Sequence, residues 1–289
     1  MKIIIILFLS INTIFAGIYR SDVDVNELIE LANQEKFDCV GKINSGNDQT
    51  FGGSCIAISE NIVITNGHVL TEVKTEPDTM EFNGQRVIVY QPVSERWVTP
   101  SEVSVELVGK TYSVKQIIIH PDYLDTNSRE IDLAIIITNE KIEGISFPKI
   151  YNDELQLGKE VIGVGYGASG VGNDPASVSL KGEKIYGTNI LDSIRTIKNG
   201  YKAFYTDFDS DDDCCNVLGS SNQTAYELCA AGGDSGCPYF ITENDELFLI
   251  GILFRGNYHI DNIQKGYYYG STSGIIEIKS FASWIDEYK

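Results

Sequence analysis

The sequence predicts an all-β fold made of closed antiparallel barrels. Short runs rich in β-branched residues recur along most of the chain, and Gly, Asn and Asp, which favour turns, separate them. These runs cover residues 56–58, 62–64, 86–90, 103–108, 117–119, 133–138, 160–164, 203–206, 247–254 and 267–269. Many short strands with closely spaced turns are typical of barrels, whereas strands alternating with helices would indicate βαβ units.

Length and composition agree with a globular protein. The chain has 289 residues, of which 43% are hydrophobic and 22% charged, and this composition argues against long disorder, collagen and coiled coil. A chain of this length can form one large domain or two small ones. Its net charge of −19 repels phosphate backbones, so we expect no nucleic-acid partner.

The first residues have the pattern of a secretory signal peptide. Lys2 precedes an apolar run over residues 3–9, mixed apolar residues follow, and Ala16 is a small residue suited to cleavage. The alternative is a membrane anchor, but the run is shorter than the ~20 apolar residues that span a bilayer. We therefore expect residues 1–16 to be a signal peptide, the protein to be secreted and extracellular, and no membrane anchor to be present.

Helices are predicted near the two ends of the chain. Residues 26–33 form a helix-like patch inside an acidic segment. Near the C-terminus, residues 279–288 place Phe281, Trp284 and Ile285 at helical spacing. This spacing predicts a terminal amphipathic α-helix that docks on the body of the protein.

Three segments supply the side chains of a nucleophilic catalyst. In Gly232-Gly-Asp-Ser-Gly-Cys-Pro238 a serine lies between glycines on a tight turn, where backbone N–H groups can stabilise a negatively charged oxygen. Residues 52–69 predict a strand, a turn and a strand, and contain His68 near their end. Asp132 lies in an apolar strand, where a carboxylate is costly unless a donor such as an imidazole N–H pairs with it. Taken singly, residues 232–238 could be only a glycine-rich turn and His68 only a core histidine. Taken together, the three segments offer His68 as base, Asp132 as orienting acid and Ser235 as nucleophile.

With these segments the chain resembles a chymotrypsin-like (trypsin-fold) serine endopeptidase. The similarity includes His-Pro-x-Tyr followed by Asp-Leu-Ala, Gly-Asp-Ser-Gly-x-Pro, the strands at 157–167 and 249–256, and the final Ser283-Trp-Ile285 helix. It spans about residues 36–288. The resemblance implies two antiparallel six-stranded β-barrels with the triad at their interface. Combined with a polar boundary at about residues 141–153, it divides the chain as follows: 1–16 signal peptide, 17–38 an N-terminal segment that could include a propeptide, 39–145 first β-barrel, and 146–289 second β-barrel with the C-terminal helix.

The resemblance also implies how the site works. Ser235 attacks the peptide carbonyl, His68 takes its proton, and the N–H groups of Gly233 and Ser235 form the oxyanion hole. In this family a freed N-terminal ammonium pairs with the acid before the serine, here Asp234, which makes the protein a zymogen. The family's usual Ile-Val-Gly-Gly start is absent. We expect the mature form to begin between about Gly17 and Val25, and its amine or a substitute cation to pair with Asp234. The alternative is that Asp234 only accepts hydrogen bonds from backbone N–H groups.

The family's substrate pocket maps onto Cys229, Ala230, Ala231, Phe254, Arg255, Gly256 and Gly274. No acid lies at the floor, so selection of Lys or Arg at P1, the residue before the scissile bond, is not expected. An open apolar pocket favours apolar or aromatic residues. Arg255 offers the alternative of acidic substrates, and Phe254 stands where a serine often bonds the triad aspartate.

Six cysteines in a secreted chain predict disulfides, because none forms a CxxC pair and the three histidines lie far apart, which argues against a metal site. Cys39-Cys55 would join early strands of the first barrel. The other four allow three pairings. Cys214-Cys215 would close a strained ring and is disfavoured. Of the two pairings that remain, we favour Cys215-Cys229 with Cys214-Cys237. The sequon at Asn222 predicts a glycan.

The sequence thus predicts a serine endopeptidase that acts on protein or peptide substrates as a monomer. It needs no cofactor and no metal, and protein inhibitors are further candidate partners. The alternative is a catalytically silent homologue that acts as an extracellular binding module, although such proteins usually lose a triad residue. A secreted structural β-protein would leave the ordered motifs unexplained.

Overall fold

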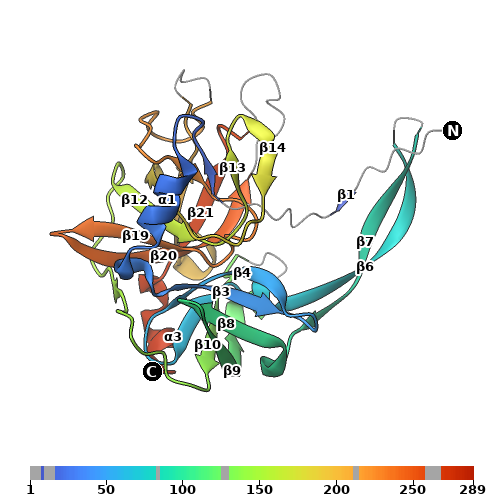
Figure 1. Ribbon diagram of the computed structural model, residues 1–289, viewed down its shortest axis with the longest axis horizontal. Coiled ribbons are helices and arrows are strands. Elements are labelled where there is room, and N and C mark those ends of the chain that lie inside the picture. The colour runs from blue at the N-terminus through green and yellow to red at the C-terminus, as the bar shows by residue number, and fades with distance from the viewer. Residues whose placement is uncertain (1–7, 10–16, 83–84, 125–129, 211–214, 258–267) are drawn as a thin grey trace.

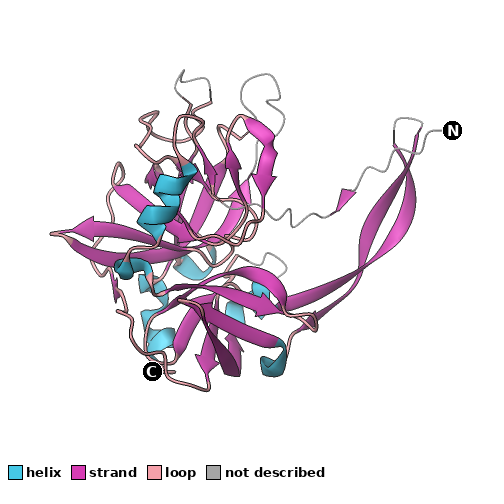
Figure 2. Cartoon of the chain, in the orientation of Figure 1, coloured by secondary structure: helices cyan, strands magenta, loops and turns pink. Residues whose placement is uncertain are grey.

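The computed structural model describes residues 8–9, 17–82, 85–124, 130–210, 215–257 and 268–289 (Figure 1). Strands predominate over short helices, as Figure 2 shows, and the described part of the chain contains one closed barrel and a short C-terminal helix. The α-helices are α1 (Val25–Ala32), α2 (Pro121–Leu124) and α3 (Ala282–Asp286). Among the described residues, no helix is long and apolar enough to cross a membrane.

The first half of the chain forms a closed six-stranded barrel. Its strands are β3 (Val40–Ser45), β4 (Thr50–Ala57), β5 (Ile62–Thr65), β8 (Val103–Leu107), β9 (Lys110–Ile119) and β10 (Ala134–Thr138), closed in the order β10-β5-β4-β3-β8-β9. In β8, buried residues alternate with half-buried ones, so that one face of the strand fills the barrel. The barrel predicted for this part of the chain is confirmed.

The second half forms an eight-stranded sheet and part of a smaller one. The large sheet contains β11 (Lys149–Ile150), β12 (Glu160–Gly165), β15 (Ile185–Ile190), β16 (Ser193–Thr196), β17 (Lys202–Asp207), β19 (Pro238–Glu243), β20 (Glu246–Asn257) and β21 (Thr272–Glu277). Its order is β15-β12-β19-β20-β21-β17-β16, with β11 on β20. Because the pairing between described strands does not close into a ring, the second six-stranded barrel stays an expectation.

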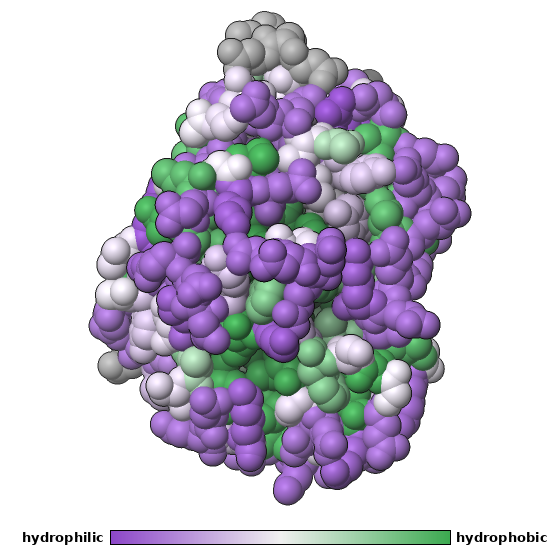
Figure 3. Space-filling view, turned by 90° about the vertical axis from the view of Figure 1, so that its left-hand side faces the viewer, coloured by the Kyte–Doolittle hydropathy of each residue, from purple (hydrophilic) through white to green (hydrophobic). Residues whose placement is uncertain are grey.

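One hydrophobic core joins the two halves. It contains Ile56 and Ile64 from the barrel, Phe240 and Ile252 from the large sheet, and Phe281 beside the C-terminal helix, all without significant exposure. This shared core fixes the two halves against each other, so that loops from both can contribute to one site. On the face shown in Figure 3, hydrophilic residues dominate and hydrophobic ones gather in the lower half.

The segment that follows residue 16 is built into the second half. β2 (Ile18–Tyr19) pairs parallel with β13 (Ser169–Val171) and antiparallel with β18 (Leu228–Cys229), and β14 (Asp174–Ser179) completes this four-stranded sheet. Ile18 is fully buried. The predicted helix at residues 26–33 is confirmed as α1, which begins where the Asp24 side chain accepts a hydrogen bond from the Asn26 N–H.

The predicted C-terminal helix is confirmed but shorter. A 3-10 turn over Lys279–Phe281 leads into α3, and Phe281 and Ile285 are buried. The rings of Phe281 and Trp284 contact the buried imidazole of His120 edge-on. His120 lies in the first half of the chain, so the helix helps to hold the two halves together.

A long two-stranded ribbon leaves the barrel directly after His68. β6 (Thr71–Phe82) pairs with β7 (Gln85–Trp97) over their whole length, and β1 (Phe8–Leu9) pairs parallel with β7. Figures 1 and 2 show the ribbon projecting away from the body. The predicted run at residues 86–90 covers only part of β7. The other strand was not predicted, because β6 is rich in acidic residues and contains Pro77, which are depleted in strands.

The structure corrects the predicted disulfides. Cys39, Cys55, Cys229 and Cys237 are free buried thiols, so none of the pairings Cys39-Cys55, Cys215-Cys229 and Cys214-Cys237 is formed. Cys215 is disulfide-bonded, and Cys214 lies outside the described residues.

The register of the first barrel explains the missing Cys39-Cys55 bond. Cys55 lies opposite Gly41, whereas the Cys39 carbonyl accepts a hydrogen bond from the Ala57 N–H. The two cysteines are therefore diagonal neighbours, which lie about 7–8 Å apart, beyond the usual span of a disulfide. Burial raises the pKa of the Cys39 and Cys229 thiols to about 12, so both are protonated at neutral pH.

Candidate active site

His68 begins a short 3-10 turn after β5 ends at Thr65. The residue before it must be small, because a Cβ on Gly67 would lie 2.9 Å from the Tyr123 ring and 3.2 Å from Asp132 Oδ1. The turn thus brings the backbone close to Asp132. As a result, the His68 N–H donates to Asp132 Oδ1 at 3.0 Å, and the imidazole points into the cleft between the two halves.

Asp132 precedes β10 and is 4% exposed. Its Oδ2 is hydrogen-bonded to His68 Nδ1, and its own carbonyl accepts from the Asn66 side-chain amide at 2.7 Å. The predicted donor for this buried carboxylate is therefore the imidazole N–H. A carboxylate on Nδ1 keeps the proton there and leaves Nε2 free to accept one.

Ser235 lies on the tight turn before β19. The turn is closed by the Asp234 N–H, which donates to the Ala231 carbonyl at 3.1 Å, while Gly233 and Gly236 have φ of +92° and +82°. These left-handed conformations favour glycine. A Cβ on Gly236 would also lie 2.3 Å from the Ser54 carbonyl oxygen. The motif's glycines are thus required by the turn that presents the serine.

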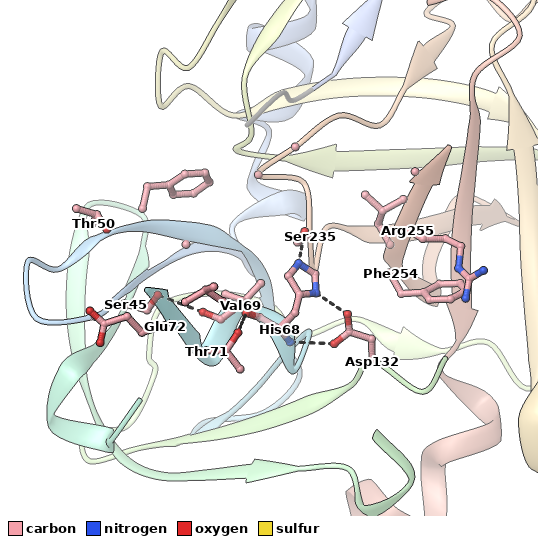
Figure 4. Close-up of a pocket in the computed structure, with 18 of the residues that line it drawn as sticks. Ser45, Thr50, His68, Val69, Thr71, Glu72, Asp132, Ser235, Phe254 and Arg255 are labelled. Carbon is pink, nitrogen blue, oxygen red and sulfur yellow. Dashed lines mark hydrogen bonds and ion pairs between the residues drawn. The ribbon is translucent and has the colours of Figure 1, made fainter. Parts of the chain in front are cut away.

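The three predicted catalytic side chains meet in one line (Figure 4). Ser235 Oγ lies 2.7 Å from His68 Nε2, and His68 Nδ1 contacts Asp132 on the other side of the ring. His68 and Asp132 come from the first half of the chain and Ser235 from the second. The arrangement places a hydroxyl, a base and an orienting carboxylate at hydrogen-bonding distance, which is the geometry of an activated nucleophile.

Asp234, the predicted activation partner, is buried below the turn and is 3% exposed. Its carboxylate accepts hydrogen bonds from the N–H groups of Gly17 at 2.9 Å, Ala231 at 3.1 Å and Gly167 at 3.3 Å. Burial raises its pKa to about 6, because these N–H donors only partly replace water around the charge. Residue 17 is thus placed beside the nucleophile turn although 217 positions separate it from Asp234.

A cleft of about 690 Å³ opens over the triad. Four of the predicted pocket residues line it: Ala231, Phe254, Arg255 and Gly256. The other three predicted pocket residues, Cys229, Ala230 and Gly274, are buried and do not line it. The predicted oxyanion-hole residues Gly233 and Ser235 both face the cleft.

Arg255 and Phe254 form one wall of this cleft (Figure 4). The Arg255 guanidinium carbon lies 4.6 Å from the centre of the Phe254 ring, which is 7% exposed. A Cβ on Gly274 would lie 2.8 Å from Arg255 Cγ, so that glycine leaves room for the arginine stem. Arg255 is the one Lys or Arg among the described residues that line the cleft. Arg255 therefore brings a positive charge to this wall of the cleft.

The opposite wall contains residues that the sequence did not identify. Asp48 comes from the turn between β3 and β4, and Phe51 from the start of β4. Glu72 and Val73 come from the root of the ribbon. In the sequence, the only indication of this wall is that residues 72 and 73 closely follow His68. No local pattern distinguishes these four residues, because their place in the cleft depends on the path of the ribbon and on the turn between β3 and β4.

The remaining predictions for the site concern metal and sugar. No group of metal-ligating side chains occurs within the described part of the chain. Asn222 is exposed in a loop, and its N–H donates to Ser220 Oγ at 3.1 Å. An exposed asparagine is accessible to modification, so the glycan stays a prediction.

Comparison with protein families gives one match. The family model described as Trypsin covers residues 29–285, which include all three members of the line formed by His68, Asp132 and Ser235. A comparison with curated protein sequences found no significant match.

Proposed function

Because the chain belongs to the trypsin family, serine proteases of the chymotrypsin type, we propose that it is a secreted serine endopeptidase that uses His68, Asp132 and Ser235. The single observation that carries the proposal is the line of three side chains, with Ser235 Oγ 2.7 Å from His68 Nε2. Without a base at this distance a serine hydroxyl is a weak nucleophile.

The reaction has two halves. Ser235 Oγ attacks the peptide carbonyl while its proton passes to His68 Nε2, and Asp132 stabilises the imidazolium that forms. The proton then moves to the amine of the leaving segment, the peptide C–N bond breaks, and an acyl-enzyme ester remains on Ser235. Water, activated by the same imidazole, attacks the ester and releases the acid product.

The N–H groups of Gly233 and Ser235 are the donors we propose for the oxyanion. The positive φ of Gly233 supports this role, because it turns the backbone of the nucleophile loop. Ser54 holds the loop from the opposite half, since its hydroxyl donates to the Gly233 carbonyl at 3.2 Å and its N–H donates to the Ser235 carbonyl at 2.8 Å. Such preorganised donors are usually the largest single contribution to acyl transfer.

An activity-based probe tests the proposal. A fluorophosphonate should label the protein on Ser235 only, with mass mapping of the modified peptide as the readout, because only a serine activated by its neighbours reacts. Ser113 serves as an internal control: its hydroxyl is hydrogen-bonded to the Glu140 carboxylate on the outside of the barrel. Labelling of Ser113, or of no serine, would favour the catalytically silent binding module.

The contacts of Gly17 support a specific mature N-terminus. We propose that cleavage after Ala16 releases Gly17, whose new ammonium then pairs with Asp234. Glycine fits there without rearrangement, whereas a Cβ on residue 17 would lie 2.6 Å from Leu228 Cδ1 and would require that side chain to move. In this proposal residues 1–16 are the signal peptide, residues 17–38 belong to the mature enzyme, and removal of the signal peptide is the activating step.

Arg255 allows the two proposed substrate classes to be separated. We expect peptide-library profiling to show a preference for apolar or aromatic residues at P1, with acidic residues as the second class and Lys or Arg disfavoured. Arg255→Gln should lower kcat/KM for acidic substrates about fivefold or more, since the charge-assisted contact with the acidic side chain is lost, and leave aromatic substrates nearly unchanged. Arg195→Gln is a matched control, because that arginine stacks on Tyr205 outside the cleft. Equal losses on acidic and aromatic substrates would contradict a charge-specific role.

A further inference from the structure

The ribbon formed by β6 and β7 is an exposed structure with its root in the catalytic cleft. Strands of 12 and 13 residues extend about 40 Å. Residues 73–79 on β6 are all exposed, as is Val93 on β7. An isolated two-stranded ribbon is only marginally stable in water, so an element this long gains stability when a third strand joins it.

The root of the ribbon is fixed in position. Arg96 on β7 pairs with Glu72 on β6 and with Glu102 beside the barrel, the latter at 2.7 Å. Trp97 contacts the Tyr123 ring edge-on at 5.9 Å, and Tyr123 itself lines the cleft. Since Glu72 and Val73 also line the cleft, a polypeptide that leaves Ser235 on this side passes directly onto the ribbon.

The pairing of β6 with β7 leaves part of the ribbon's backbone hydrogen-bonding groups directed toward its two outer edges. Pro77 lies opposite Tyr90, and Pro92 lies opposite Thr75. The two pairs are two positions apart along β6, so they have the same parity and their backbone N–H and C=O groups point the same way. Proline is tolerated in a ladder where its missing N–H would point outward. Residues of this parity, which include the Thr79 and Ile88 pair, therefore direct their N–H and C=O groups away from the partner strand.

One strand already occupies the outer edge of β7. In the full-length chain, β1 lies parallel to it, with Phe8 opposite Val89 and Leu9 opposite Tyr90. The added segment is extended and apolar, and it comes from the part of the chain that we expect to be removed as a signal peptide. Its removal would leave this edge of β7 free.

We propose that the outer edge of β7 binds an extended apolar segment of the protein substrate as an added β-strand, so that the ribbon is a docking site outside the cleft. This rests on the proposed function. Main-chain hydrogen bonds would supply affinity, as in other cases of strand addition. Because the ribbon starts at the cleft wall, the docked segment and the scissile bond belong to one continuous stretch of substrate. Short peptides would reach the triad without contacting the ribbon.

Two matched proline variants in the active enzyme test this docking site. Ile88→Pro removes an outward N–H from the β7 edge. Thr79→Pro removes the N–H across the same pair on β6, which donates to Asp78 Oδ1 at 2.7 Å. With β-casein, an unfolded protein substrate, we expect Ile88→Pro to raise KM about fivefold or more and Thr79→Pro to have little effect. Both variants should cleave a chromogenic tetrapeptide, chosen from the P1 profile, as the wild type does.

A shortened ribbon covers the case in which a proline variant misfolds. Replacing residues 77–90 by Asn-Gly joins Glu76 to Gln91 through a two-residue hairpin turn and keeps the root of the ribbon. This variant should have a raised KM for β-casein, as Ile88→Pro does, and should hydrolyse the tetrapeptide at the wild-type rate. If it cleaves β-casein with the wild-type KM, or if Ile88→Pro and Thr79→Pro behave alike, the docking site on β7 is wrong.

Binding without turnover separates this proposal from the proposed function. Fluorescein-labelled β-casein is titrated into Ser235→Ala protein, with and without Ile88→Pro, and the anisotropy gives Kd. A Kd at least about fivefold weaker with Ile88→Pro supports docking even if the wild type hydrolyses nothing. An unchanged Kd overturns docking even if the wild type is an active protease. A change in oligomeric state on Ile88→Pro would instead identify a second copy of the chain as the added strand.

Discussion

Replacement of Ser235 by alanine should lower kcat/KM by about 10³-fold or more on any peptide substrate. The hydroxyl that attacks the carbonyl is lost, while His68 and Asp132 keep their contacts with each other. The residual rate would come from the remaining N–H donors and substrate binding. Initial rates on a tetrapeptide substrate, measured at matched protein concentrations, give the ratio.

A matched control separates lost chemistry from lost folding. Ser113→Ala removes a hydroxyl that is hydrogen-bonded to Glu140 on the surface of the barrel, away from the cleft. It should keep kcat/KM within about threefold of wild type, because one exposed hydrogen bond contributes about 1 kcal/mol. Both variants should keep a free energy of unfolding in urea within about 1 kcal/mol of the wild type. More than a tenth of wild-type activity in Ser235→Ala would mean that another group is the nucleophile.

Extending the chain before Gly17 should have the second-largest effect. With Ser-Gly-Ser in front, residue 17 offers Asp234 a peptide N–H, as it does in the full-length chain, rather than an ammonium. We expect a loss of about 10²-fold in kcat/KM, comparable to the loss of one oxyanion-hole donor, because Asp234 adjoins the turn that carries Gly233 and Ser235. The comparison is with protein that begins at Gly17, its terminus verified by mass spectrometry. Equal activity of the two forms would show that no free amine is required.

The two forms should also differ in how pH affects their stability. With only amide donors, the pKa of Asp234 is about 6, above its ordinary value of 3.8. Between these values the native protein binds more protons than the unfolded chain, so the free energy of unfolding falls by about 3 kcal/mol as pH rises from about 4 to above 6. A free ammonium supplies the opposite charge and should abolish this fall. Urea unfolding of both forms at pH 4.5 and 7.5 measures the difference, and parallel behaviour would contradict the ion pair.

The chemistry of the candidate site could be predicted from the sequence because residue type determines it. An aspartate within an apolar run needs a donor, and a serine between glycines needs a turn, so Asp132 and Ser235 could be recognised before any contact was known. Asp132 lies just before β10 rather than inside the strand, but it is buried as the apolar run indicates. The strands of the barrel were predicted for a related reason. Their β-branched runs record which side chains are buried, as in β10, where four of the five residues are buried.

Three features were decided only by the tertiary structure. The contact of Gly17 with Asp234 joins positions 217 residues apart, which no local pattern can indicate. The free thiol of Cys55 follows from a register that places Gly41 opposite it. β6 forms although its sequence is acidic and contains Pro77, because its pairing with β7 supplies the hydrogen bonds that its own residues do not favour. Local sequence reports backbone preference and burial, whereas register and long-range contacts result from how distant segments pack together.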